Sequence, residues 1–294
     1  MGHNPFLEPA RRASPRSGAR AARSIAASVA LLLVFVFASP HEAAAQGKGH
    51  GHPAWVSDIA VASANIVVGG VTAAVTALIR GEDVSEAFLK GAAGGGVVFA
   101  GKRVAAERFD GAGLLGRQIA SVGSSMVADA GLGRDLFTEI WLPLGPVWVQ
   151  VRPEARWRAR VNLHDVGSVI WAATRPELRF DLGRSLSNGA PVFVADQHLI
   201  LVDGEVAFGF AVGGTVVIGG TARDAERVQR HENIHVLQHD YFVMTVTRRV
   251  ERWVWRRLTT REIPLDFGFP AALISLVSWD NTLLQSEAEV FESR

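Results

Sequence analysis

The chain has 294 residues, which is enough for one or two domains and for a sizeable buried core. Its 30 basic and 29 acidic residues nearly cancel, so no overall positive charge points to nucleic acid as a partner. Cysteine is absent, which excludes disulfides, cysteine-ligated zinc and thiol nucleophiles and leaves His, Asp and Glu as candidate metal ligands.

Residues 1–45 have the order of a secretory signal peptide. Five arginines and no acid lie in residues 11–23, an uncharged stretch with an apolar run at residues 31–37 follows, and small residues end at Ala45. We therefore expect cleavage after Ala45, export to the periplasm or cell envelope of a bacterium, and a flexible mature N-terminus over residues 46–58. An uncleaved anchor helix is the alternative, which the shortness of the apolar run disfavours.

A glycine-rich helical region is predicted for residues 59–138. Residues 59–79 carry no charge and are long enough to span a bilayer, but Ala, Gly, Thr and Ser outnumber Leu, so their insertion into lipid would be weak. Residues 88–101 and 112–130 repeat small residues at three- and four-residue intervals, which lets helix backbones approach closely. Packing on the globular domain and insertion in a membrane are both compatible with this pattern.

Within the last predicted domain, residues 139–294, the pattern changes from helical to β at about Trp141. The predicted elements are strands over residues 147–151, 155–161, 178–182, 192–195, 198–202, 206–212 and 215–218, a helix over residues 164–173, and a hairpin turn at Asp203-Gly204. An antiparallel β-meander is therefore expected. It leads into a helix with Thr221 as the predicted N-cap and Asp224 in the first turn.

The sequence HENIH at residues 231–235 places two histidines four residues apart on that helix. Residues at this spacing share one face, so His231 and His235 can reach one metal ion while Glu232 lies beside it. The apolar periodicity of the helix puts both histidines on the inward face. Because buried imidazoles need polar partners, a metal ion would satisfy them better than an apolar core.

The motif resembles the HExxH zinc metallopeptidases, the zincins, and the resemblance is limited to the motif helix and to a C-terminal helix bearing Glu. It implies that His231 and His235 bind Zn2+ and that Glu232 is the general base, which takes a proton from the zinc-bound water. It also implies a peptide or protein substrate. In this family a sheet flanks the metal helix and offers an edge to an extended substrate.

A catalytic zinc site takes three protein ligands, and His239 is the third candidate nearest in sequence. On a continuous helix it lies about 12 Å along the axis from His231, so both reach one ion only if the helix breaks. His239 is therefore expected beside the ligands or on the substrate side. His164 and His198 are more simply ordinary polar residues.

The other candidates lie in an acidic segment near the C-terminus, which resembles the later helix that supplies a Glu ligand in gluzincins. The usual E-x-x-A-D order is not met, because Gln285 stands three residues before Ala288. Glu287 is the favoured third ligand and Glu289 the second choice, with Glu292 left open. An exposed acidic tail is the alternative to a ligand role.

Basic residues and tryptophans alternate at helical spacing from Arg248 to Leu258. This stretch is either an interfacial helix on anionic lipid or the C-terminal half of the motif helix, packed by Trp253. An apolar helix over residues 271–279 is expected to pack against the metal helix.

Together these patterns predict an α+β fold: glycine-rich N-terminal helices, a β-meander, a zinc-binding helix and C-terminal helices. The predicted function is that of an exported zinc-dependent metallohydrolase, a peptidase by resemblance. The alternative is a non-catalytic, membrane-associated envelope protein, which docks through the glycine-rich helices or the segment from Arg248 to Leu258. In that case the metal site would be structural or vestigial.

Overall fold

The structure, a computed structural model, describes residues 54–152, 155–197, 199–200, 206–220, 224–248, 265–266, 287–288 and 290–291. The predicted signal peptide, the helix at residues 271–279, His198, Glu289 and Glu292 lie outside the described residues. So does the stretch after Arg248 as far as Leu258.

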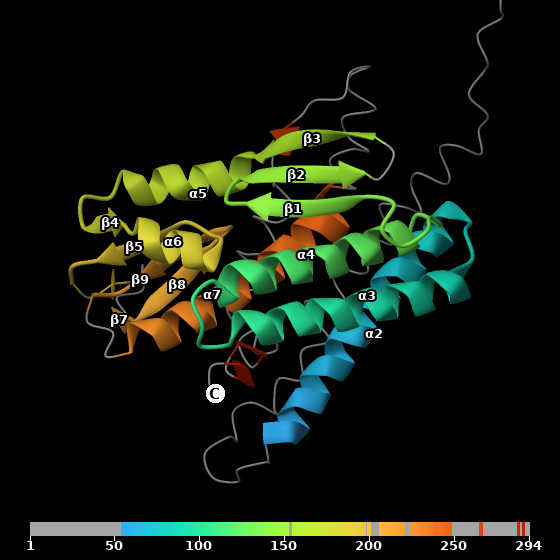
Figure 1. The fold of residues 1–294 in the computed structure, drawn as a ribbon, viewed down its shortest axis with the longest axis horizontal. Coiled ribbons are helices and arrows are strands. Elements are labelled where there is room, and N and C mark those ends of the chain that lie inside the picture. The colour runs from blue at the N-terminus through green and yellow to red at the C-terminus, as the bar shows by residue number, and fades with distance from the viewer. Residues whose placement is uncertain are drawn as a thin grey trace, which may run out of the picture.

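Three long helices come first: α2 (Ala54–Arg80), α3 (Val84–Ala105) and α4 (Ala112–Ala130). Strands and shorter helices follow, so the predicted α+β fold with glycine-rich helices ahead of the β region is confirmed. In Figure 1 the green helix α4 lies between α3 and the strands β1 to β3, and the strands between residues 178 and 218 gather at one end of the helices.

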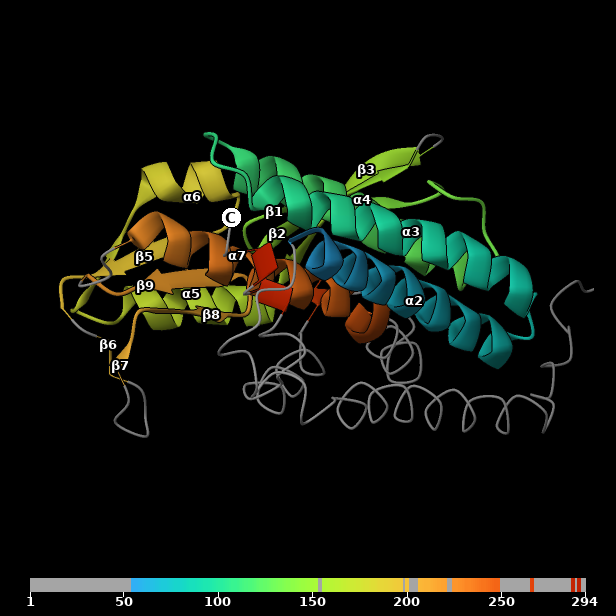
Figure 2. The ribbon, with the colours of Figure 1, turned by 90° about the horizontal axis from the view of Figure 1, so that it is seen from below.

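Glycines allow the long helices to approach one another closely. A Cβ atom at Gly94 would lie 2.8 Å from the carbonyl oxygen of Gly123, and one at Gly123 would lie 2.6 Å from the carbonyl oxygen of Gly94. Gly101 and Gly116 form a second such pair between α3 and α4. The tight packing expected from the spacing of small residues is therefore present, and Figure 2 shows α2 lying along α3 on the other side.

Helix α2 has one packed side and one exposed apolar side. Gly69 contacts the backbone of Gly95 on α3, whereas Ile59, Val67 and Leu78 are exposed. By length and composition the part from Asp58 to Arg80 could cross a membrane, the one helix among the described residues that could. The membrane contact predicted for this region therefore stays a prediction.

The first sheet contains β1 (Ile140–Leu144), β2 (Val147–Arg152), β3 (Ala155–Asn162) and β10 (Leu265–Asp266), in that order. Its first three strands are antiparallel, and β10 runs parallel to β3. Trp141 fixes the sheet to α4, because its carbonyl accepts from Ser121 Oγ at 2.5 Å and its amide donates to Ser125 Oγ at 3.0 Å. The guanidinium of buried Arg248 lies 3.9 Å from the Trp141 ring and 4.5 Å from the Trp148 ring, so this residue faces the core.

Between the sheets lies α5 (Leu163–Ala173), which Asn162 caps by accepting from the amide of His164. The second sheet has the order β4-β5-β9-β8. Its strands and the adjoining elements are β4 (Leu178–Phe180), α6 (Leu182–Asn188), β5 (Val192–Ala195), β8 (Gly209–Val212) and β9 (Thr215–Ile218), with β6 (Leu199–Ile200) and β7 (Val206–Ala207) as a separate antiparallel pair. The pairing of β6 with β7 agrees with the predicted hairpin.

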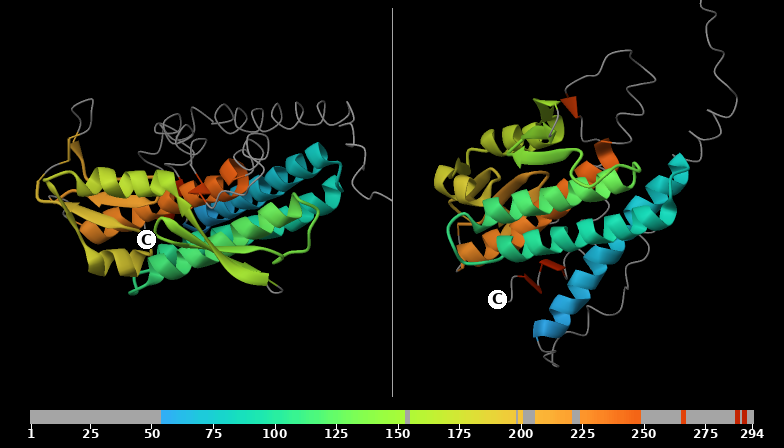
Figure 3. Two further views of the ribbon diagram at one scale, coloured as in Figure 1. Left: turned by 90° about the horizontal axis from the view of Figure 1, so that it is seen from above. Right: turned by 45° about the vertical axis from the view of Figure 1, so that its right-hand side comes forward.

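The predicted antiparallel meander is wrong in two respects. Strands β5 and β9 run parallel, and the strand predicted over residues 206–212 is two strands, β7 and β8, which belong to different sheets. After β5 the chain leaves the sheet, forms the β6–β7 pair and returns through β8. The β8–β9 hairpin then turns at Gly213, whose φ of 55° suits glycine, so β9 takes the direction of β5. Figure 3 shows this sheet beside α5 and α7.

Helix α7 (Ala225–Phe242) carries the HENIH motif. Its N-cap is Asp224, whose carboxylate accepts from the amide of Arg227 at 2.9 Å, so the predicted cap at Thr221 is wrong. Aspartate is the better N-cap of the two, which agrees with the start of the helix at Ala225. The helix lies between the second sheet and α4: Val236 packs with Val192, Val216 and Ile218, whereas Ile234 and Leu237 pack with Ala105, Ala120, Ala288 and Phe291. It continues as the π-helix η1 (Val243–Thr247).

Asp129 gives the fold a testable pH dependence. Burial and the nearby charge of Glu139 raise the pKa of Asp129 to about 6, against the partial compensation of Arg134 and backbone hydrogen bonds. Between about pH 4 and pH 6 the folded chain holds a proton that the unfolded chain has released, so stability falls as the pH rises through this window. We expect Asp129→Asn to remove this loss of stability between about pH 4 and pH 6, because Asn does not titrate. Its Oδ1 atom can still accept from the amide of Glu139, so the fold is kept. Urea unfolding at several pH values measures it, and parallel pH profiles for both proteins would contradict the expectation.

Candidate functional site

The two histidines of the motif meet on α7, where His231 is buried and His235 is half-buried. His231 Nε2 lies 3.2 Å from His235 Nε2, and the ring planes are nearly perpendicular, at 74°. Two Zn–N bonds at a tetrahedral angle place their nitrogen atoms about 3.3 Å apart. The separation is thus that of two ligands of one zinc ion, and it is also that of a direct hydrogen bond between the two rings in the metal-free protein.

The Nδ1 side of the His235 ring contacts Gln238, which lies about one turn further along α7. His235 Nδ1 lies 2.8 Å from Gln238 Oε1, so the ring has one nitrogen directed at Gln238 and the other at His231. In metal sites a hydrogen bond to the second ring nitrogen fixes the orientation of the ligand. Gln238 is only 4% exposed, so this contact lies in the protein interior.

Glu232 is also buried, at 7% exposure, and is next in sequence to His231. Its Cγ atom lies 3.3 Å from the position that a Cβ atom would take at Gly209 on β8. Strand β8 is the last strand in the described order of the second sheet. The Glu232 side chain therefore passes this strand at Gly209.

Glu287 lies close to the motif but not on the two facing nitrogens. Gln238 Nε2 donates to its Oε2 at 2.7 Å, Asn65 Nδ2 donates to its Oε1 at 2.6 Å, and Lys102 Nζ lies 2.8 and 2.7 Å from the two oxygens. Burial raises the pKa of Glu287, but the charge of Lys102 and these hydrogen bonds outweigh it and hold the pKa below its ordinary value. In the described residues its link to the histidines runs through Gln238.

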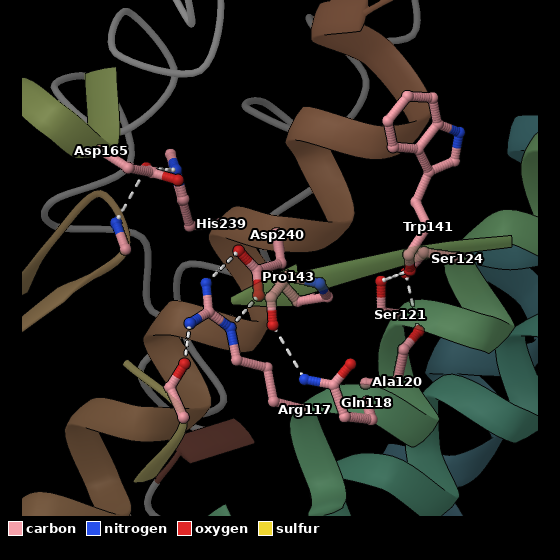
Figure 4. Close-up of polar contacts among 12 residues, drawn as sticks. Arg117, Gln118, Ala120, Ser121, Ser124, Trp141, Pro143, Asp165, His239 and Asp240 are labelled. Carbon is pink, nitrogen blue, oxygen red and sulfur yellow. Dashed lines mark hydrogen bonds and ion pairs between the residues drawn. The ribbon is translucent and has the colours of Figure 1, made fainter. Parts of the chain in front are cut away.

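His239 belongs to a different cluster, one turn beyond His235. Its Nε2 atom lies 2.9 Å from Asp165 Oδ1, which also accepts from the amide of Gly214 at 3.1 Å (Figure 4). The His164 ring lies 5.3 Å from the His239 ring, centre to centre. Because α7 is continuous across this turn, His239 does not join His231, as the helix geometry predicts.

The positive charges of His239 and Arg117 stabilise the ionised form of Asp165 in this cluster. Burial raises the pKa of Asp165, but His239 and Arg117 outweigh burial and hold it below its ordinary value. Burial and the charge of His239 lower the pKa of His164. Arg117 on α4 also binds Asp240 through Nε at 2.6 Å and Nη2 at 3.1 Å, and donates to the carbonyl of Gly189, as Figure 4 shows.

Of the predicted site residues, the structure brings together His231, His235 and, through Gln238, Glu287. It places His239 with Asp165 instead. Within the described part of the chain, no three His, Asp or Glu side chains form a group that could hold a metal ion. The identity of the third ligand therefore stays a prediction, and Glu289 is the named alternative outside the described residues.

Several residues of the site were missed from the sequence: Asn65, Lys102, Arg117, Asp165 and Gln238. The sequence around a buried lysine or arginine does not reveal its burial, because the burial depends on a partner that is distant in the sequence. Gln238 offered the best signal, since it lies three residues after His235 and so on a neighbouring part of the helix surface.

Comparisons of this chain with models of protein families, with curated proteins and with solved structures find no match.

Proposed function

We propose that the protein is a zinc-dependent hydrolase acting on peptides or proteins, with His231 and His235 as two zinc ligands. The observation that carries the proposal is the 3.2 Å separation of the two Nε2 atoms on α7, between a buried His231 and a half-buried His235. Fixing of His235 by Gln238 supports it, because ligating imidazoles are commonly held in this way.

Zinc, when bound, supplies a Lewis acid that polarises a carbonyl group and acidifies water. Glu232 is proposed as the general base, which takes a proton from the attacking water and passes it to the leaving amine. Its position at β8 supports this role. In the zincin resemblance an extended substrate pairs with a sheet edge beside the metal helix, and β8 is the strand of the second sheet that lies beside Glu232.

We further propose that the enzyme works in the periplasm or cell envelope of a bacterium. The basic, apolar and small-residue order of residues 1–45 supports export. The exposed apolar side of α2 supports contact with a membrane surface, which would place the site near envelope substrates.

Metal content tests the proposal. Purified full-length protein is expected to contain about one zinc ion per chain, and His231→Ala or His235→Ala is expected to lose it, because each removes a ligand. Glu232→Gln is expected to keep the zinc and to lower peptide hydrolysis by about 100-fold, since it removes the base but not a ligand. Elemental analysis and cleavage of unfolded casein measure the two effects, and chelation followed by zinc addition should abolish and restore activity.

A matched control is Gln229→Ala, on the same helix but bonded to Arg184 rather than to the histidines. It should keep both zinc and activity. Intact protein without zinc would overturn the proposal. If such protein also floated with anionic vesicles, the non-catalytic envelope function would be favoured, for which the exposed face of α2 is the specific observation.

A further inference from the structure

We infer that Glu287 is a positioning residue: through Gln238 it forces His235 to carry its proton on Nδ1 and so to present the Nε2 lone pair to the metal. The inference deepens the proposed function and rests on it for the identity of the metal. The juxtaposition that carries it is the chain of contacts from Lys102 to Glu287, to Gln238 and to His235.

The direction of the hydrogen bonds follows from chemistry. An ionised carboxylate can only accept, so the group of Gln238 facing Glu287 Oε2 must be its amide nitrogen, 2.7 Å away. The carbonyl oxygen of Gln238 then faces His235 Nδ1 at 2.8 Å. Because an amide oxygen can only accept, Nδ1 must be the protonated nitrogen of the neutral ring. The lone pair is left on Nε2, the atom facing His231.

The carboxylate is held ionised by its surroundings. Lys102 Nζ contacts both oxygens of Glu287 and also donates to Asn65 Oδ1 at 3.0 Å. The Lys102 side chain is 5% exposed and that of Glu287 is 12% exposed. A buried carboxylate with a paired ammonium and two amide donors has its acceptor sites filled, which fixes its orientation.

This arrangement favours positioning over direct ligation. Glu287 reaches the Nδ1 side of His235, whereas the two candidate ligand atoms face each other on the Nε2 side. To bind the same ion, the carboxylate would have to leave Lys102, Asn65 and Gln238. The buried Lys102 would then lose its counter-ion, a costly change in a low-dielectric interior.

The contacts also join distant parts of the chain to the motif. Asn65 lies on α2, Lys102 on α3 and Gln238 on α7, while Ala288 and Phe291 after Glu287 pack against Ile234 and Leu237. The glycine-rich helices therefore contribute to the orientation of His235. This gives them a role in the site that composition alone did not predict.

Three variants test the inference: Gln238→Leu, Glu287→Gln and the exchange Gln238→Glu with Glu287→Gln. Gln238→Leu removes the acceptor and is expected to weaken zinc binding about 10–100-fold, the usual effect of losing such a contact. Glu287→Gln is expected to weaken it too, because its amide can present either end to Gln238. The exchange should restore binding to within about 3-fold of the original, since a carboxylate at residue 238 again accepts from Nδ1–H.

Two readouts separate the outcomes. Zinc affinity is measured by competition with a chelator, and the tautomer of His235 by 15N chemical shifts in metal-free protein, where an Nδ1–H ring is expected. Gln118→Leu, which removes an amide bonded to the carbonyl of Pro143 on the first sheet, is the control and should change neither.

If Glu287 were a ligand, Glu287→Gln and the exchange would lose zinc alike while Gln238→Leu kept it, and the inference would be overturned. An Nε2–H tautomer in the original protein would also overturn it. Failure of the proposed function looks different: no variant would bind zinc, yet the tautomer would still respond to Gln238→Leu.

Discussion

Replacing Arg117 by methionine is expected to lower the free energy of unfolding by about 3–5 kcal/mol. The Arg117 side chain is fully buried and holds Asp240 through two nitrogen atoms, so the variant leaves a carboxylate that is 5% exposed without its partner. The carbonyl of Gly189 at the end of α6 loses a donor as well. Urea unfolding followed by tryptophan fluorescence measures the loss.

The matched variant is Arg117→Met combined with Asp240→Leu. Removing both charges avoids an unpaired buried ion, and we expect the double variant to recover most of the loss of the single one. The difference is the coupling energy of the pair, which a double-mutant cycle with Asp240→Leu isolates. Equal stability of the single and double variants would show that Asp240 finds another partner or water.

The motif helix was predictable from the sequence because its signals are local. Helical spacing placed His231 and His235 on one face, and the close contact of their nitrogens follows from that spacing. The glycine intervals likewise predicted close helix packing, which Gly94 and Gly123 show. Both predictions use the 3.6-residue period, and neither needs to know which distant segment is the partner.

Contacts between distant segments could not be predicted in this way. Glu287 has the chemical type of a third ligand. Only the structure shows that Lys102 on α3 already contacts both of its oxygens. The parallel pairing of β5 with β9 depends on where the chain goes between them, which strand periodicity does not determine. The role of a polar residue in a packed helix, such as Asn65 in α2, can be recognised only when its distant partner is known, here Glu287.

Gly101→Ala is expected to lower the stability of the protein strongly, because α3 and α4 approach each other closely at this residue. A Cβ atom at Gly101 would lie 2.6 Å from the carbonyl oxygen of Gly116 and 2.7 Å from Ala120 Cα. Both are backbone atoms, so no side-chain rotation relieves the overlap and the helices must separate. We expect a loss of about 3 kcal/mol in the free energy of unfolding, measured by urea, despite the better helix propensity of alanine.

Gly96→Ala, on the same helix, supplies the control, because its Cβ would meet only Ile66 Cγ1 at 3.8 Å. There the change should stabilise the protein by about 0.5–1 kcal/mol through helix propensity alone.

Gly116→Ala should cost about as much as Gly101→Ala, and the double variant less than the sum, since one separation of the helices accommodates both methyl groups. Stabilisation by Gly101→Ala of the size seen for Gly96→Ala would mean that α3 and α4 do not touch at this point. Helix contact there also bears on the site, because Lys102 follows Gly101 directly and its ammonium must stay within reach of Glu287.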